Sequence, residues 1–177
     1  MKDDLQRLAA LIRDRNSIER SIASITGRPA LTGHTGEYIA ADIFDIQLVE
    51  SASEKGIDGH FMSGSLAGRS VNIKWYTIRQ NLLDLSPESP SDYYLVMTGV
   101  KSGDVSSRGQ VYLATVSSVF LFEWETLLAV LQQRKVKLGI ATSVAEYLWA
   151  DAEIYPEQRN GTLVLTSAQY DRLGLFA

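Results

Sequence analysis

The chain has 177 residues and no cysteine; 45% of the residues are apolar, 21% are charged, and the formal net charge is −4. This length suits one domain with a substantial core, and the lack of cysteine excludes disulfides, thiolate metal sites and cysteine nucleophiles. No apolar run approaches the roughly 20 residues of a membrane span. The acids and arginines at the start do not fit a signal peptide. We therefore expect a cytoplasmic protein with no membrane partner.

The negative charge argues against a protein that coats nucleic acid without specificity, because such binding depends on Lys and Arg displacing counterions. A local basic groove on an acidic body is compatible with it.

The N-terminal segment 3–26 has helical periodicity, with a break expected near Asn16–Ser17. Leu5, Leu8 and Ile12 share a stripe before the break, and a second isoleucine stripe follows it. The simplest interpretation is a pair of helices packed on the domain. The alternative is a contact in a dimer.

The segment 33–46 also predicts a helix, in which Glu37 begins a stripe that continues through Ala40, Ala41 and Phe44. A glutamate so placed faces the core side of the helix. Its alternative role is to complement the helix dipole in the first turn.

The segment 56–76 predicts a β-hairpin, because two alternating runs flank the Gly/Ser-rich turn 63–68. Its apolar side chains alternate with polar ones. Opposed residues of an antiparallel pair point to the same side, so any register whose paired numbers add to an even value gathers the polar groups on one face. That polar face carries four side chains: Asp58, His60, Asn72 and Lys74.

The rest of the chain predicts alternating elements of one α/β domain. Before the hairpin we expect a strand at 47–50. After it we expect a loop at 77–91, a buried strand at 92–100, a strand at 110–116, a helix at 120–135, a helix at 143–150, an edge strand at 161–165 and a final helix at 167–173.

A helix glutamate, a strand aspartate, the tripeptide Asn72-Ile73-Lys74 and a buried strand opened by Asp92 follow one another here. In this the sequence resembles the PD-(D/E)xK nuclease superfamily, over about 33–116. The resemblance implies a restriction-endonuclease-like α-β-β-β-α-β core, with a mixed sheet flanked by helices and extra helices at the N-terminus. We expect one domain over 1–177, with a helical extension at 1–32, the nuclease-like core at 33–135 and an αβα tail at 136–177.

The resemblance also implies roles for individual residues. Glu37 matches the family's helix acid, Asp58 its strand aspartate and Lys74 its motif lysine. Asp58 and Glu37 would bind Mg²⁺ or Mn²⁺, and Lys74 would assist the attacking water. Asn72 stands where the family carries Asp or Glu, and an amide oxygen can coordinate a hard cation but brings no charge.

Four further residues are weaker candidates for contacts with a DNA backbone: His60, Arg69, Tyr76 and Arg79. The expected function is a metal-dependent DNA endonuclease, and cleavage of both strands would require a homodimer. One alternative is a non-catalytic member of the same fold that binds DNA or protein. Another is an unrelated α/β domain whose hairpin face is merely solvated, with Asp58 and Lys74 forming a cross-strand salt bridge.

Overall fold

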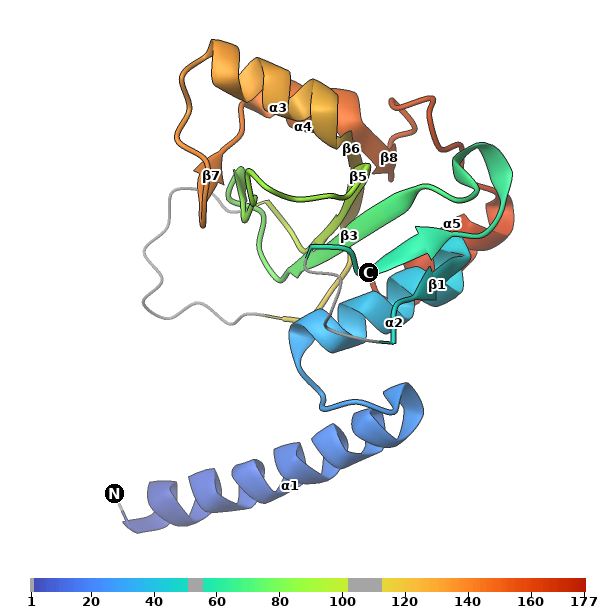
Figure 1. Ribbon diagram of the computed structural model, residues 1–177. Helices are drawn as coiled ribbons and strands as arrows, with labels where there is room; N and C mark the ends of the chain where they lie inside the picture. Colours follow the sequence, from blue (N-terminus) through green and yellow to red (C-terminus); the bar gives the residue numbers. More distant parts are fainter. Residues whose placement is uncertain (1, 51–55, 102–112) are drawn as a thin grey trace.

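The computed structural model describes residues 2–50, 56–101 and 113–177. They form a mixed α/β structure in which helices cover both faces of a six-stranded sheet (Figure 1). The elements are α1 (Lys2–Thr26), α2 (Thr32–Phe44), β1 (Ile46–Leu48), β2 (Gly59–Phe61), a 3-10 turn (Gly64–Leu66), β3 (Ser70–Tyr76), β4 (Leu82–Leu83), β5 (Tyr93–Thr98), β6 (Ser118–Glu123), α3 (Trp124–Gln133), β7 (Thr142–Ser143), α4 (Glu146–Ala152), β8 (Glu153–Tyr155) and α5 (Ser167–Gly174).

The strand order is β1-β2-β3-β5-β6-β8, so β3 and β5 lie at the centre of the sheet. These two strands are parallel, and every other neighbouring pair is antiparallel. All six residues of β5 are buried, as expected for a central strand that is covered on both faces. The expectation of a mixed sheet flanked by helices is therefore confirmed.

The two faces of the sheet carry separate hydrophobic clusters. One cluster joins Val71 and Ile73 of β3 to α2 and α5. The other joins Tyr94 and Val96 of β5 to α3 and α4, and Trp124 at the start of α3 packs on Tyr94 with ring centroids 5.3 Å apart. Successive side chains of a central strand therefore point to opposite faces of the sheet and pack against different helices.

The hairpin register is the one that gathers the polar residues. Gly59 lies opposite Val71 and His60 opposite Ser70, so the paired numbers add to an even value, as predicted. The ladder is shorter than expected, because β2 begins only at Gly59. Asp58 therefore lies just outside the paired strand.

The predicted strand at 110–116 and helix at 120–135 are wrong in their boundaries. Residues 110–112 lie outside the described residues, and 113–116 form no strand. Instead 118–123 pair with β5 along its whole length, and the helix begins only at Trp124. Phe120 and Phe122, two residues apart, lie on one face of β6 and pack against α3 and α4. The apolar spacing of this segment also fits a helix, but its pairing with β5 makes it a strand.

The predicted edge strand at 161–165 is also wrong. The amide side chain of Gln158 bonds the Leu163 carbonyl and the Leu165 N–H, which takes the place of strand pairing there. Beside β6 the edge strand is β8, at 153–155. Residues 77–92 between β3 and β5 contain no helix, in agreement with the loop predicted at 77–91. The short strand β4 in this segment pairs with β7.

The N-terminal extension is one continuous helix of 25 residues, without the predicted break. Figure 1 shows α1 standing away from the sheet and approaching the rest of the molecule only near its C-terminal end. Among the described residues, no helix has both the length and the apolar character needed to cross a bilayer.

Candidate functional site

Asp58 occupies the point where the β2–β3 ladder ends. Its backbone N–H donates to the Val71 carbonyl at 2.9 Å, and its Oδ2 accepts the Ile73 N–H at 2.7 Å. Residues two apart on a strand direct their backbone groups to the same side, so Ile73 N–H faces the edge that β2 no longer covers. The Asp58 carboxylate takes the place of the next ladder acceptor.

The electrostatic surroundings of Asp58 connect it to two other predicted site residues. The pKa of the Asp58 carboxyl is raised overall. Burial, the largest cause, raises it, and the Glu37 carboxylate raises it further. The hydrogen bond from the Ile73 N–H and the cations of Lys74 and Arg28 lower it, but by less. Glu37, Asp58 and Lys74 therefore lie close enough for their charges to act on one another. The charge of Asp58 is only partly compensated in this site.

Glu37 belongs to α2, and its neighbour Gly36 allows α2 to pack closely on β3. A Cβ at Gly36 would lie 2.8 Å from Trp75 Cβ of β3, a separation that packed carbons do not tolerate. The Glu37 carboxylate forms an ion pair with Arg28, which belongs to the link between α1 and α2. Arg28 was not among the predicted residues, and no sequence spacing connects it to Glu37.

Asn72 is only 5% exposed, and its two amide atoms have different surroundings. The NH₂ donates to the Gly56 carbonyl at 3.1 Å. Because that carbonyl can only accept, Oδ1 must point the other way, and it has no hydrogen-bond partner among the described residues. A buried unsatisfied carbonyl oxygen is costly, so this atom is suited to accept from a bound group or to coordinate a cation.

Lys74 follows Asn72 on the same face of β3, opposite Val96 of β5, and is half-buried. It forms no ion pair or hydrogen bond with another described residue, so the cross-strand Asp58–Lys74 salt bridge of the solvated-face alternative is not formed. Within 2–50, 56–101 and 113–177, no cluster of three or more His, Asp or Glu side chains could hold a metal. Protein ligands for a cation would therefore be two carboxylates and the Asn72 amide oxygen.

His60 and Arg69 lie at the other end of the hairpin, beside Asp92. Arg69 pairs with Asp92 at 3.1 Å, while Asp92 also accepts from the N–H and hydroxyl of Ser70. Burial acts to raise the pKa of Asp92, but these Ser70 hydrogen bonds, then Arg69 and His60, lower it overall. Asp92 thus fixes the start of β5 to β3, and Arg69 serves this structural contact.

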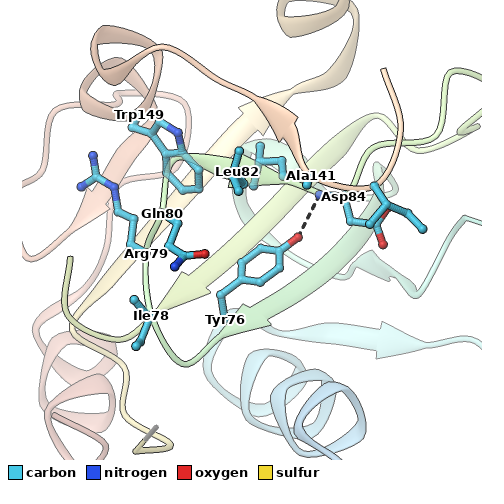
Figure 2. A pocket seen from close by; sticks show the side chains of 10 residues that line it. Tyr76, Ile78, Arg79, Gln80, Leu82, Asp84, Ala141 and Trp149 are labelled. Carbon is cyan, nitrogen blue, oxygen red and sulfur yellow. Dashed lines mark hydrogen bonds between the residues drawn. The ribbon is translucent and has the colours of Figure 1, made fainter. Parts of the chain in front are cut away.

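Tyr76 and Arg79 line a pocket of about 290 Å³ beyond the end of β3 (Figure 2). The Tyr76 hydroxyl accepts the Asp84 N–H at 3.0 Å. The guanidinium of Arg79 lies about 5 Å from the ring centres of Phe120 and Trp149 and forms an ion pair with Glu146. Arg79 is therefore held inward by the fold rather than free for a phosphate.

The Arg79 contacts belong to a network that the sequence did not reveal. Glu146 of α4 accepts from Asn81 at 2.6 Å and from Lys101 at 3.0 Å, besides Arg79. Partial burial acts to raise the pKa of Glu146, but hydrogen bonds from Lys101, Asn81 and Arg79 outweigh it and lower the pKa to about 2. This network fixes α4 to the segment that follows β3.

The charges of Glu37 and Lys74 both act on Asp58. However, α2 covers the β3 face that carries Val71 and Ile73, whereas Asn72 and Lys74 lie on the opposite face of the sheet. Arg69 and Arg79 pair with other carboxylates, those of Asp92 and Glu146. A comparison of the sequence with protein-family models and with curated proteins finds no match to either.

Proposed function

We propose that this chain is a metal-dependent phosphodiesterase that acts on nucleic acid, with DNA as the substrate class and a PD-(D/E)xK-like site. The observation that carries the proposal is the position of Asp58. Its partly compensated carboxylate lies at the open end of the β2–β3 ladder, within charge range of both Glu37 and Lys74. A site with one incompletely neutralised acid and one unpaired lysine is suited to bind a divalent cation and a phosphate together.

The residues present are compatible with Mg²⁺ or Mn²⁺. Asp58 Oδ1 accepts no hydrogen bond from a described residue, and the buried Asn72 Oδ1 is also unpaired. Hard cations prefer oxygen ligands, and Mg²⁺ commonly keeps several waters beside one or two carboxylates. Asp58 and Asn72 would hold the cation, with Glu37 joining once its ion pair with Arg28 opens. Such a cation supplies Lewis-acid polarisation of the phosphoryl group.

The reaction would add water across one P–O bond. The water oxygen bonds to phosphorus, the alcohol oxygen of the leaving strand departs, and the proton of the water ends on that alcohol. The Lys74 ammonium would orient the water and offset the negative charge that grows on the phosphoryl oxygens. Half-burial of Lys74 strengthens this effect, because the local dielectric constant is lower than in water.

A second candidate function is binding without catalysis. The Arg28–Glu37 ion pair occupies the helix carboxylate, and Asn72 replaces the usual acid. A protein of this kind would use Lys74 and Arg28 as fixed phosphate contacts and would need no cation.

Cleavage of supercoiled and linear DNA, with Mg²⁺, with Mn²⁺ and with EDTA, separates the two functions. Asp58→Ala should abolish cleavage, and Lys74→Ala should slow it about 10²-fold or more while keeping cation binding. Asp151→Ala and Lys137→Ala are matched controls, since both residues are exposed and distant in the chain from the hairpin. Metal-independent DNA binding without cleavage, lost in Lys74→Ala, would favour the binding module instead.

A further inference from the structure

α1 presents a seam of mostly apolar residues that the described chain leaves largely uncovered, with only Ile22 half-buried. Residues at alternating spacings of three and four form one stripe along the helix, as in the a and d positions of a heptad repeat. The exposed fractions along it are 52% for Leu8, 56% for Leu11, 61% for Ile18 and 68% for Ile25. The stripe consists of Leu8, Leu11, Arg15, Ile18, Ile22 and Ile25.

The stripe is wider in the first half of the helix. Leu5 and Ile12, 68% and 49% exposed, occupy the flanking e positions of the same repeat. The positions opposite the seam are polar: Gln6, Arg13 and Arg20. A 25-residue helix with such a seam is about 37 Å long at 1.5 Å per residue. Exposed patches of this kind mark an interaction surface.

We infer that the seam is covered by α1 of a second copy of this chain, in an antiparallel pair. The heptad spacing itself favours another helix with the same spacing, because a and d side chains of one helix fill the gaps of the other. A membrane surface is disfavoured, since interfacial helices carry a strongly basic polar face. The polar side of α1 carries both signs, with Arg7, Arg13 and Arg20 beside Asp14 and Glu19.

The charges select the antiparallel direction. In a parallel pair, Asp14 at a g position would approach Glu19 at the e position of the other helix, and two Arg15 side chains would meet in one layer. Like charges in these positions are destabilising. A parallel pair would therefore carry repulsion at its centre.

The antiparallel direction instead gives a consistent set of layers. Leu8 lies opposite Ile25 of the other copy, and Leu11 lies opposite Ile22. Arg15 lies opposite Ile18, and its methylene groups can cover apolar surface there. Its guanidinium can keep the hydrogen bond that it donates to Glu19 of its own helix, which is 2.8 Å long in the single chain. The same layers repeat with the copies exchanged, so the contact is isologous and closes as a two-fold dimer.

Sedimentation velocity of the full chain over a concentration series tests the pairing. We expect a species of twice the 19.6 kDa chain mass. Leu11→Glu and Ile18→Glu, which each place a carboxylate in the seam, should raise the dimer dissociation constant at least tenfold. Gln6→Glu on the polar face is the matched control and should leave the dimer unchanged. A wild-type chain that stays monomeric, or a dimer that survives both seam variants, would overturn the inference.

Introduced cysteines test the direction, because the natural chain has none. Under mild oxidation, a mixture of Leu8→Cys and Ile25→Cys chains should form crosslinked heterodimers, while neither variant crosslinks with itself. Self-crosslinking of Leu8→Cys alone would show a parallel pair and contradict the antiparallel assignment. Unchanged circular dichroism and unfolding midpoints verify that each variant is folded.

Discussion

At the scale of single residues, two carboxylates in this molecule have opposite environments. Asp58 is half-buried, its charge is only partly compensated, and its pKa is raised. Glu146 receives three donors, and its pKa is lowered to about 2. A well-paired acid such as Glu146 stabilises structure, whereas an acid whose charge is costly in the free protein is suited to bind a cation.

The Glu146 network predicts a specific pH dependence. The folded-state pKa of about 2 lies below the ordinary value of 4.5, so the contribution to stability is complete above pH 4.5 and is lost as the pH falls towards 2. Glu146→Gln should therefore lower the free energy of unfolding at pH 7, with a difference from wild type that shrinks between pH 4.5 and 2. Urea unfolding at a series of pH values measures this difference.

Salt is a second variable in the same experiment. The Glu146 side chain is 51% exposed, so 1 M NaCl should weaken the effect. Glu88→Gln is the control, since Glu88 is exposed and forms no ion pair with a described residue. A Glu146→Gln difference that stays constant from pH 7 to pH 2 would show that the network does not act through ionisation.

At the scale of elements, the position of Glu37 depends on how closely α2 packs on β3. Gly36→Ala would place a methyl group against Trp75 and Met97, with Trp75 Cβ at 2.8 Å. We expect a loss of about 1–3 kcal/mol in unfolding free energy and an outward shift of the start of α2. Chemical denaturation measures the first effect.

Gly33 gives the matched control within the same helix. A Cβ there meets nothing within 4 Å, so Gly33→Ala should stabilise the chain by about 0.4–1 kcal/mol. Equal effects of the two alanine substitutions would contradict the proposed close contact between α2 and β3.

Elements whose apolar residues fit only one periodicity, that of a strand or that of a helix, could be predicted from the sequence. Elements whose residues fit both periodicities could not. The hairpin register followed from the alternation around the 63–68 turn, and β5 from its dense run of β-formers. Phe120 and Trp124 also fit a helical stripe, but pairing with β5 makes 118–123 a strand. Tertiary context decided that boundary.

The candidate site could likewise be predicted from the sequence only in part. The alternation of polar residues predicted one face for Asp58, Asn72 and Lys74. Asn72 and Lys74 do share a face of β3, whereas Asp58 lies beyond the end of the β2–β3 ladder. The Arg28–Glu37 and Arg79–Glu146 ion pairs join residues from separate elements, and no local spacing signals such contacts. Sequence periodicity identifies a face of a strand, whereas these partners depend on how elements pack.

At the scale of the whole molecule, the proposed dimer bears on the site. In the antiparallel pair, the first turn of α1 from one copy lies beside residues 27–31 of the other, the link that carries Arg28. Because Arg28 pairs with Glu37, association of the copies would act on the carboxylate that is expected to join the cation. Two sites in one two-fold assembly also match the requirement for cutting both strands of a duplex.

Thermal unfolding with and without Mg²⁺ tests whether a divalent cation binds at Asp58. At ten times its dissociation constant the cation adds about 1.4 kcal/mol to stability, roughly 3–6 °C for a domain of this size. Asp58→Asn keeps an acceptor for the Ile73 N–H but should abolish the shift. Asn72→Asp should lower the midpoint without metal, because two neighbouring carboxylates repel, and should show a larger Mg²⁺ shift than wild type. A destabilisation of Asn72→Asp that Mg²⁺ does not relieve, together with no shift in wild type, would show that no cation binds at Asp58.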